Sequence, residues 1–295
     1  MKRLLLTGGC GFIGRNVKPL LDESYEVTTL GLNTMNDIQT DLSAGVPSVG
    51  ACDIVLHTAG KAHFVPRNDE EAREFYDINY QGTVNLCASL ESVGVPEIFI
   101  YVSTTAVYGC DEGESIEETH ALDAQTPYAK SKLKAEVFLI EWCHKHGVKL
   151  AVIRPPLVVG LNPPGNLGRL IQGIKTGRYL CIGEGRAKKS VLMVQDIASL
   201  IPLLEKTPGI YNVCSDDQPT FRDIELLVCN QLKMRRPKAL PLWAARILAR
   251  IGDGLGSKAP INTRIFNKIT KSLTFSNAKA KSELGWKPLS IKENF

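Results

Sequence analysis

Short apolar runs alternate along the chain with longer segments in which apolar residues recur every three or four positions. The runs are typical of strands buried on both faces, and the longer segments are typical of amphipathic helices. The predicted strands cover residues 4–6, 26–30, 52–57, 97–102, 149–153, 190–194 and 210–214. The predicted helices cover residues 12–21, 69–93, 127–146, 167–175, 197–206 and 220–232.

This alternation predicts an α/β fold with a Rossmann-like, doubly wound parallel sheet. The alternation is strict up to residue 159, so residues 1–159 are assigned to a dinucleotide-binding domain. Residues 190–206 are expected to return to its sheet, with Asp196 capping the helix. Residues 160–189 and 207–295 are assigned to a smaller, mostly C-terminal α/β domain.

A glycine-rich turn leads from the first strand into the first helix. In such a turn Gly8 allows the tight bend, Gly11 lets the backbone approach a pyrophosphate, and Gly14 lets helix and strand pack closely. The free amides at the start of the helix, where Phe12 and Ile13 stand, favour phosphate charge. A flexible turn is the alternative, but the position at the start of an alternating chain predicts a dinucleotide site.

The end of the second strand usually decides between NAD and NADP. An acidic residue there binds the ribose hydroxyls, whereas a nearby arginine accommodates the 2′-phosphate. Gly31 occupies this position, so the choice stays open, with Asn33 and Arg15 as the nearest polar side chains. Asp41, next to Leu42, either accepts a hydrogen bond from the adenine amine or is an exposed loop residue.

Small and hydroxyl-bearing residues follow two of the central strands. They are Thr58, Ala59 and Gly60 after the strand 52–57, and Ser103, Thr104 and Thr105 after the strand 97–102. Ligands of open α/β sheets bind at the carboxyl ends of the strands, so we expect these residues to border a cofactor. Asn79, in the long helix between the two strands, either bonds strand backbone or faces solvent.

Tyr128 and Lys132 stand four residues apart near the start of the helix 127–146, so they lie on one helical face. A lysine ammonium beside a phenol lowers the pKa of the phenol toward neutrality. A tyrosine tuned in this way gives or takes a proton at physiological pH. The spacing by itself also allows the alternative of an ordinary helix that carries a tyrosine and surface lysines.

The composition argues against several other classes of function. A net charge of +4 over 295 residues does not indicate nucleic-acid binding. The eight cysteines lack the spacing of a zinc site, so no metal is expected, and reduced thiols in a cytoplasmic protein are the simplest interpretation. The chain opens directly into a strand, which leaves no room for a signal peptide.

Contact with a membrane is not expected either, because no apolar run approaches the roughly 20 residues of a membrane span. Residues 240–251 form an amphipathic segment that could lie on a membrane surface. For so short a helix, packing against the smaller domain is the favoured interpretation.

Four motifs at matching intervals resemble the extended short-chain dehydrogenase/reductase family. They are TGGCGFIG at the N-terminus, DINYQGTVNL around Asn79, STTAVYG after the central strand and PYAKSK around Tyr128. The C-terminal KAKSELGWKP is similar to the closing motif of that family. The resemblance covers nearly the whole chain. It implies NAD or NADP along the N-terminal sheet and a nucleotide-linked sugar in the C-terminal part.

The resemblance also implies roles for individual residues. Tyr128 would be the acid/base, Lys132 would bond the nicotinamide ribose and depress the tyrosine pKa, and Thr104 would bond the reacting oxygen. Asn166 and Leu167 resemble a pair that contacts the nucleotide of the sugar. The remaining implied positions are Pro155 at the cofactor and Thr105 and Lys189 at the substrate. Relatives commonly form homodimers, here through helices 69–93 and 127–146.

Departures from the family pattern narrow the reaction. Thr105-Ala106 stand where dehydratases carry Asp-Glu, so dehydration is not expected. Leu157 and Met193 replace an asparagine and a histidine that are common in UDP-hexose 4-epimerases. The phosphate-binding arginine of the epimerases has no clear match; the candidates to replace it are Arg264, Lys268 and Lys271.

The favoured function is therefore reduction of the C4 keto group of a dTDP- or UDP-linked 4-keto-6-deoxyhexose by NAD(P)H. Such a reaction would serve the synthesis of deoxysugars for surface polysaccharides. A UDP-hexose 4-epimerase is the alternative. A non-catalytic dinucleotide sensor or scaffold is a third hypothesis, against which the intact set of Thr104, Tyr128 and Lys132 counts.

Overall fold

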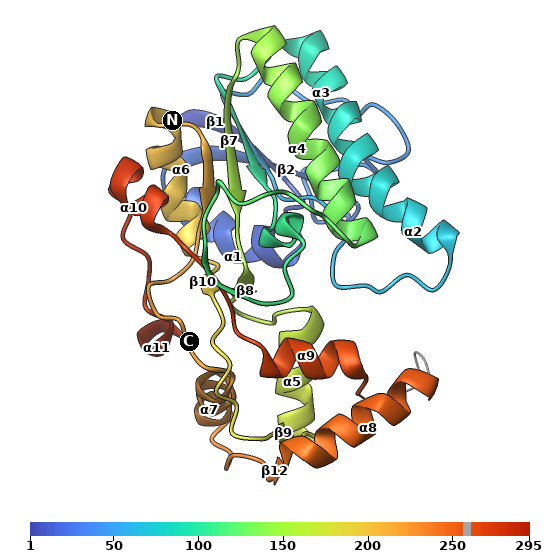
Figure 1. The fold of residues 1–295 in the computed structure, drawn as a ribbon. Helices are drawn as coiled ribbons and strands as arrows, with labels where there is room; N and C mark the ends of the chain where they lie inside the picture. The colour runs from blue at the N-terminus through green and yellow to red at the C-terminus, as the bar shows by residue number, and fades with distance from the viewer. Residues whose placement is uncertain (256–260) are drawn as a thin grey trace.

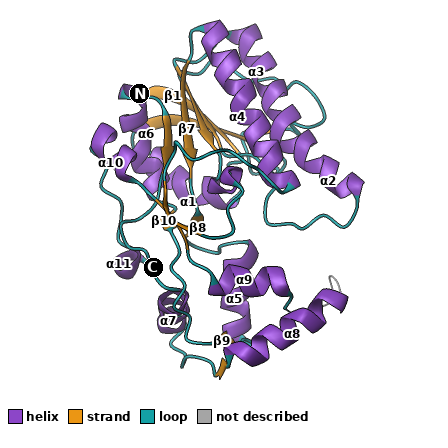
Figure 2. Ribbon diagram, in the orientation of Figure 1, coloured by secondary structure: helices purple, strands orange, loops and turns teal. Residues whose placement is uncertain are grey.

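The computed structural model describes residues 1–255 and 261–295, and its larger part is built on a seven-stranded parallel sheet (Figures 1 and 2). The strand order is β11-β7-β5-β4-β1-β2-β3. The strands are β1 (Lys2–Thr7), β2 (Tyr25–Gly31), β3 (Ile38–Gln39), β4 (Ile54–His57), β5 (Ile98–Val102), β7 (Lys149–Arg154) and β11 (Ile210–Asn212). The central strands β4 and β5 are buried along their whole length, as their unbroken apolar runs predict.

Helices cover both faces of this sheet. One face packs against α1 (Phe12–Leu21), α6 (Asp196–Lys206) and α10 (Ala278–Leu284), and the other against α3 (Gly82–Val93) and α4 (Pro127–His146). Successive residues of a strand point to opposite faces, so Leu4 and Leu6 join one core and Leu5 joins the other. The predicted doubly wound α/β fold is confirmed.

Local signals place the ends of α4 where the sequence predicts them. Thr126 is its N-cap and accepts a hydrogen bond from the amide of Ala129 at 3.1 Å. Pro127 occupies the first turn, where its missing N–H costs nothing. Gly147 ends the helix in the left-handed conformation, at φ +66°.

The predicted helix 69–93 is instead three consecutive segments. They are α2 (Asp69–Tyr76), a π-helical turn η1 (Asp77–Gln81) and α3. A π-turn inserts an extra residue into the helix and is frequent at functional sites. Here it holds Asn79, which is buried.

A smaller part carries three separate two-stranded parallel sheets, β8–β10, β9–β12 and β6–β13. Its strands are β6 (Gly113–Ile116), β8 (Leu157–Val159), β9 (Cys181–Ile182), β10 (Val191–Met193), β12 (Ala239–Leu240) and β13 (Leu273–Phe275). The accompanying helices are η2 (Thr105–Tyr108), α5 (Gly165–Lys175), α7 (Phe221–Gln231), α8 (Leu242–Leu255), α9 (Thr263–Thr270) and α11 (Ile291–Asn294).

Three expectations about the second half of the chain are wrong. β10 pairs with β8 outside that sheet, and only α6 returns to it. The edge position beside β7 is taken by β11, from the range assigned to the smaller domain. Asp196 does not cap α6, because Gln195 holds the N-cap position and the Asp196 carboxylate accepts the amide of Leu289 at 3.1 Å.

Helix α4 carries exposed apolar side chains on its outer surface. Val137 and Ile140 of α4 are 50% and 46% exposed, on the helices where the sequence places a dimer interface; the homodimer itself stays a prediction.

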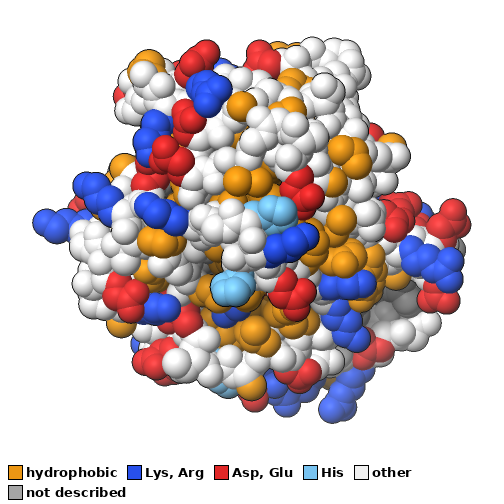
Figure 3. Space-filling model, turned by 90° about the horizontal axis from the view of Figure 1, so that it is seen from above, with side chains coloured by type: hydrophobic (Ala, Val, Ile, Leu, Met, Phe, Trp, Pro, Cys, Tyr) orange, Lys and Arg blue, Asp and Glu red, His pale blue; other side chains and the backbone are white. Residues whose placement is uncertain are grey.

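Seen from above, positive and negative side chains are interspersed over the surface (Figure 3). Among the described residues, no helix is long and apolar enough to cross a membrane.

Candidate active site

The carboxyl ends of β1 and β4 meet, and α4 lies beside them. Thr58 Oγ1 donates to the carbonyl of Thr7 at 2.7 Å, and the amide of Ala59 donates to Thr7 Oγ1 at 3.2 Å. Gly60 follows in a tight position: a Cβ atom there would lie 2.9 Å from Asn79 Oδ1 and 3.7 Å from Lys132 Nζ. The structure therefore brings these predicted cofactor residues together.

The glycine turn after β1 has the geometry that its sequence predicts. Gly8 adopts φ +73°, and a Cβ atom on it would lie 2.9 Å from the amide nitrogen of Ala59. A Cβ atom on Gly14 would collide with the Gly8 carbonyl. Gly11 donates to that carbonyl at 2.8 Å and is the N-cap of α1.

The start of α1 has no side-chain cap and no acidic residue in its first turn. Phe12 and Ile13, in the first turn, pack their partly buried side chains against the core. Backbone amides without a carboxylate nearby, beside a turn that only glycine can form, fit the diphosphate of a dinucleotide.

Asn36 is a site residue that the sequence analysis missed. It is 7% exposed, and a Cβ atom on Gly9 would lie 2.8 Å from its Oδ1. Its Nδ2 donates to the Asn33 carbonyl at 2.8 Å, whereas its Oδ1 has no partner among the described residues. An unpaired buried acceptor at the glycine turn fits a hydroxyl donor such as a ribose of the dinucleotide. No spacing rule marks a loop asparagine, so only the structure reveals it.

The two polar side chains that the sequence places nearest Gly31, Asn33 and Arg15, have partners within the chain. Asn33 is exposed, and its Oδ1 accepts the amide of Met35 at 2.8 Å. Arg15 donates to the carbonyl of Asn162 at 2.7 Å. Neither arrangement favours a 2′-hydroxyl over a 2′-phosphate, so both cofactors stay compatible with this end of the sheet.

Asp41 and Leu42 differ in their surroundings. Asp41 is exposed, and its Oδ1 accepts both the amide and the hydroxyl of Ser43, at 2.8 and 2.6 Å. Leu42 is buried, and its carbonyl accepts Asn85 Nδ2 at 2.7 Å. Of the two interpretations of Asp41, the structure matches the exposed loop residue; its contact with adenine stays a prediction.

Tyr128 and Thr104 face each other across the ends of α4 and β5. The Thr104 hydroxyl lies near enough to the Tyr128 phenol to affect its pKa, and the Tyr128 ring packs edge-on against Phe75 at 6.2 Å. Burial raises the pKa of Tyr128, and the Thr104 hydroxyl partly opposes that rise. The predicted depression of this pKa by Lys132 is therefore not found.

The state of Lys132 explains why. Its side chain is 4% exposed, and its Nζ lies 4.2 Å from the centre of the Tyr101 ring. Burial lowers the pKa of Lys132 to about 7, while the Glu136 carboxylate acts in the opposite direction. A lysine that is only partly protonated at neutral pH does little to stabilise a phenolate.

Asn79 ties this pair to the β4 loop. Its Oδ1 accepts the amide of Lys61 at 2.7 Å, and its Nδ2 donates to Ser131 Oγ at 2.9 Å. Ser131 Oγ in turn donates to the Tyr128 carbonyl at 2.8 Å. The solvent-facing alternative for Asn79 is wrong, and its amide instead joins α4 to the loop that follows β4.

A buried ion pair behind the site was also missed. Glu136 and Arg154 are 1% and 3% exposed and are joined by two hydrogen bonds, of 2.6 and 3.2 Å. Ser103, whose contact with the cofactor stays a prediction, donates its hydroxyl to Glu136. The sequence could have identified Glu136 by its spacing from Lys132, because Glu136 lies one helical turn after that lysine.

His57 is a further residue that the sequence analysis missed. It ends β4 at 1% exposure, with Nδ1 2.6 Å from Thr7 Oγ1 and Nε2 2.9 Å from Thr83 Oγ1. Burial, followed by the charge of Lys132, lowers the pKa of His57 to about 3. A neutral imidazole therefore connects the β1 and β4 ends to α3.

Because the buried His57 is neutral in the folded protein, we expect the protein to lose stability in acid. The pKa of His57 falls from the ordinary 6.5 to about 3 on folding, so its stabilising contribution is present above pH 6.5 and is lost as the pH falls toward 3. Linkage predicts a loss of roughly 2 kcal/mol between pH 7 and pH 5. Urea unfolding at both pH values measures it. His57→Asn should flatten the dependence by that amount, whereas His144→Asn, on the surface, should retain it.

The predicted substrate residues lie on both sides of the β7 end. The amide of Thr105 donates to the carbonyl of Pro155 at 3.1 Å, and both residues are buried. Asn166 is exposed in the first turn of α5. The Leu167 side chain, at 3% exposure, belongs to an apolar core cluster, so only its backbone is placed to contact a nucleotide.

Three cations gather in the smaller part. Lys189 Nζ donates to the Lys271 carbonyl at 2.6 Å, and burial and the nearby Lys268 lower its pKa to about 8. Burial and the charge of Arg264 lower the pKa of Lys268 in turn. Like charges held close together are costly unless an anion compensates them, so this cluster fits a phosphate-bearing ligand. Of the three candidates for the missing arginine, Lys268 thus stands beside Lys189 and Arg264 stands beside Lys268.

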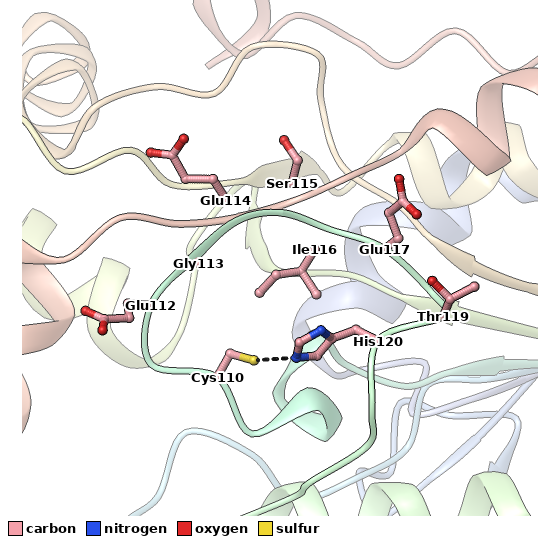
Figure 4. Close-up of a pocket in the computed structure, with 9 residues that line it drawn as sticks. All are labelled: Cys110, Glu112, Gly113, Glu114, Ser115, Ile116, Glu117, Thr119 and His120. Carbon is pink, nitrogen blue, oxygen red and sulfur yellow. Dashed lines mark hydrogen bonds between the residues drawn. The ribbon is translucent and has the colours of Figure 1, made fainter.

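A pocket in the loop between η2 and α4 is lined by acidic side chains, in contrast to the basic cluster around Lys189 (Figure 4). Glu112, Glu114 and Glu117 line it, and Cys110 Sγ lies 3.3 Å from His120 Nε2. Burial raises the pKa of the Cys110 thiol, and the neighbouring Asp111 adds to that rise. An acidic pocket with an unactivated thiol does not suit a diphosphate, so the substrate is expected at the basic cluster instead.

The sheet, the glycine turn and the Tyr128–Lys132 helix together define an NAD(P)-binding oxidoreductase of the Rossmann type. Residues 4–214 match the NAD dependent epimerase/dehydratase family. The chain belongs to this family. The expected class of enzyme and the expected cofactors, NAD or NADP, are thereby confirmed.

Individual relatives differ in the reaction they are named for. A GDP-6-deoxy-D-mannose reductase of Pseudomonas aeruginosa is 29% identical over 301 residues, covering 89% of this chain and 94% of that protein. The N-acetyl-alpha-D-glucosaminyl-diphospho-ditrans,octacis-undecaprenol 4-epimerase of Escherichia coli O157:H7 is 30% identical over 67% of this chain, a match that spans 61% of that protein. Among solved structures, RMD from Pseudomonas aeruginosa complexed with NADPH is 26% identical, with a TM-score of 0.73 over 100% of this chain and 96% of that one.

Proposed function

We propose that the protein reduces the C4 keto group of a nucleotide-linked 4-keto-6-deoxyhexose with NAD(P)H. The observation that carries this proposal is the pairing of Tyr128 with Thr104 at a site without an adjacent carboxylic acid, since Thr105 and Ala106 follow. Elimination of water needs an acid and a base at this point, and a hydroxyl and a methyl group supply neither. A proton donor and a hydrogen-bonding hydroxyl are sufficient for ketone reduction.

Each residue has a distinct part in the reaction. When bound, NAD(P)H supplies the hydride that adds to C4. The hydroxyl of Thr104 donates a hydrogen bond to the keto oxygen, and Tyr128 gives that oxygen its phenolic proton, which yields the C4 hydroxyl. Lys132 holds the ribose of the cofactor, as the resemblance implies. Gly8, Gly11 and Gly14 receive its diphosphate.

The protonation of Tyr128 supports the direction of the reaction. Because its pKa is raised, the phenol keeps its proton at neutral pH and is ready to act as an acid. An epimerase begins by removing a proton from a hydroxyl, which needs a phenolate. Reduction can begin directly from this protonated state, whereas epimerisation first requires the phenol to lose its proton.

The test follows NAD(P)H absorbance during incubation with dTDP-, UDP- and GDP-linked 4-keto-6-deoxyhexoses. Stoichiometric oxidation of the cofactor with formation of the C4 hydroxyl supports the proposal. Interconversion of UDP-glucose and UDP-galactose without net oxidation contradicts it and favours an epimerase. Failure of every substrate, with dinucleotide binding intact, leaves the sensor or scaffold hypothesis.

A 4-epimerase is the second candidate, since the relative with 30% identity is named for that reaction on a diphospho-undecaprenol-linked sugar. The panel therefore also includes a polyprenyl-diphosphate-linked N-acetylhexosamine. Conversion of this sugar to its C4 epimer, without loss of NAD(P)H absorbance, would replace the reductase by this candidate.

Binding of the sugar nucleotide is predicted to depend on pH through Lys189. Its pKa of about 8 means that the ammonium is present below that pH and is lost above it. A bound diphosphate favours the protonated form, so affinity should weaken by up to about tenfold per pH unit above 8. Calorimetric titration with UDP or dTDP measures this trend. Lys189→Met should weaken binding and flatten the dependence, whereas Lys188→Met, at the exposed neighbour, should change neither.

A further inference from the structure

Helix α8 packs against the smaller part of the protein through its smallest side chains. Ala245 and Ala249 are 0% and 1% exposed and lie in a cluster with Phe266 of α9 and Ile182 of β9. Gly252, a further turn along, is buried as well. This face allows α8 to lie close to α9.

The large apolar side chains of α8 point the other way. Trp243, Ile247 and Ile251 are 70%, 51% and 57% exposed, and their spacing of four residues forms one stripe along the helix. Leu248 beside them is 45% exposed. The expected packing of this segment against the smaller domain is found, but it is made by the alanines and not by these large side chains. Exposed large apolar residues gathered on one helical face mark a binding surface.

Two arginines border the stripe. Arg246 and Arg250 come three residues after Trp243 and Ile247, so they are their neighbours on the helix surface. Both are exposed, and within residues 1–255 and 261–295 neither forms an ion pair with a carboxylate. Arg246 extends over the Phe266 ring at 5.8 Å. Long basic side chains beside a tryptophan and aliphatic residues are typical of a helix at a lipid–water interface.

Basic and acidic residues are distributed unevenly along the sequence. Residues 226–282 contain twelve of the 35 Lys and Arg but only one, Asp253, of the 31 Asp and Glu. The rest of the chain therefore holds 23 basic and 30 acidic residues, so the net charge of +4 hides a basic stretch of sequence that contains α8 and α9; its last two lysines, Lys279 and Lys281, lie on α10 against the seven-stranded sheet. Such an asymmetry attracts an anionic surface.

Figure 1 places α8 at the lower edge of the molecule, beside α9 and at the end remote from the seven-stranded sheet. A helix at an edge can meet a plane without hindrance from the rest of the fold. We propose that α8 docks the protein on an anionic phospholipid bilayer. The helix lies in the plane of the interface, with Trp243, Ile247 and Ile251 in the lipid and Arg246 and Arg250 at the phosphates.

A bilayer suits this face better than a second copy of the chain does. Two copies joined through α8 would bring together the α8 and α9 helices of both, which carry four basic residues and one acidic residue in each copy, and like charges repel. An anionic bilayer, by contrast, attracts the basic side chains of this face. The proposal is independent of the sugar reaction.

The test uses the full chain and vesicles made of equal parts of phosphatidylcholine and phosphatidylglycerol, with vesicles of pure phosphatidylcholine as the neutral comparison. We expect co-sedimentation with the anionic vesicles that weakens as salt is raised. Of the three tryptophans, Trp142 and Trp286 are 5% and 3% exposed, so a blue shift of the emission on binding reports Trp243.

Two variants separate the apolar and the basic contributions. Trp243→Ser with Ile247→Ser should reduce partitioning into anionic vesicles by about tenfold or more. Arg246→Gln with Arg250→Gln should remove most of the preference for anionic over neutral vesicles. The matched control is Leu20→Ser with Val95→Ser, two apolar side chains that are each 40% exposed on other elements, and it should bind like the wild type.

Three results would overturn the proposal: wild-type protein that ignores anionic vesicles, serine variants that bind as well as wild type, or serine variants that lower the solution mass in the absence of lipid. The last result would assign the face to a second copy. Circular dichroism and NADH binding establish that each variant is folded. These readouts do not use sugar turnover, so failure of the proposed reaction leaves the vesicle result interpretable.

Discussion

Tyr128→Phe is expected to lower turnover by about 10²- to 10⁴-fold while NAD(P)H binding stays unchanged. The substitution removes the phenolic proton but keeps the ring, whose edge-on contact with Phe75 at 6.2 Å positions the start of α4. The neighbouring backbone keeps its hydrogen bond as well, because Ser131 donates to the carbonyl of residue 128 and not to its side chain.

The measurement is kcat from nicotinamide absorbance together with the dissociation constant of NADH from fluorescence. Tyr80→Phe is the matched control, because Tyr80 contributes a ring packed edge-on against Phe138 and lies away from Thr104. Retention of turnover in Tyr128→Phe would remove the assigned role. A parallel loss of NADH affinity would show that the effect is structural.

The same residue predicts the pH dependence of the reduction. Reduction needs the protonated phenol, and the pKa of Tyr128 lies above its ordinary value of 10.0 because the group is buried. The rate of the chemical step should therefore stay level through neutral pH and decline only above pH 10. A decline already near pH 7 would mean that the bound cofactor or substrate lowers this pKa, as the resemblance to the family implies.

Arg154→Met is expected to produce the largest loss of stability, about 3–5 kcal/mol in the free energy of unfolding. The substitution leaves the Glu136 carboxylate without its charged partner in a site that is 1% exposed. It also removes the donor at 3.0 Å to the Tyr108 hydroxyl, which itself donates to Asn212 of β11 at 2.8 Å. The network therefore holds α4, β7 and β11 together.

Urea unfolding of two further variants separates the buried charge from the lost contacts. Glu136→Gln combined with Arg154→Met should be less destabilised than Arg154→Met alone, because no charge is left unpaired. Arg3→Met is the control: its partner Asp53 is 2.9 Å away, but the Arg3 side chain is 51% exposed, so about 0–1 kcal/mol is expected. Equal losses in Arg154→Met and Arg3→Met would contradict the argument.

The sequence predicted the central sheet and its main helices because their signals are local. An unbroken apolar run marks a strand buried on both faces, and Thr126, Pro127 and Gly147 mark the two ends of α4. The positions of Tyr128 and Lys132 on one helical face follow from the same periodicity. The glycine turn was equally accessible, because only glycine tolerates the backbone conformation of Gly8.

The pairing of strands in the second half of the chain could not be predicted in this way. The segment 190–194 has the composition of a buried strand, and β10 is indeed one, but nothing in its residues distinguishes β7 from β8 as its neighbour. Strand β11 instead occupies the edge of the seven-stranded sheet, beside β7. Which strand fills an edge depends on how the connecting segments pack, which is a property of the whole chain.

The sequence by itself determined the class of fold, the glycine turn and the pairing of Tyr128 with Lys132 on one helical face, since each depends on residues that are close together in the chain. Only the tertiary structure decided the protonation of that pair, because the pKa of Tyr128 and that of Lys132 depend on burial by distant segments. It likewise placed Glu136 against Arg154 and His57 between two threonines. It also turned the large side chains of α8 outward, because the small residues of that helix fit closest to α9.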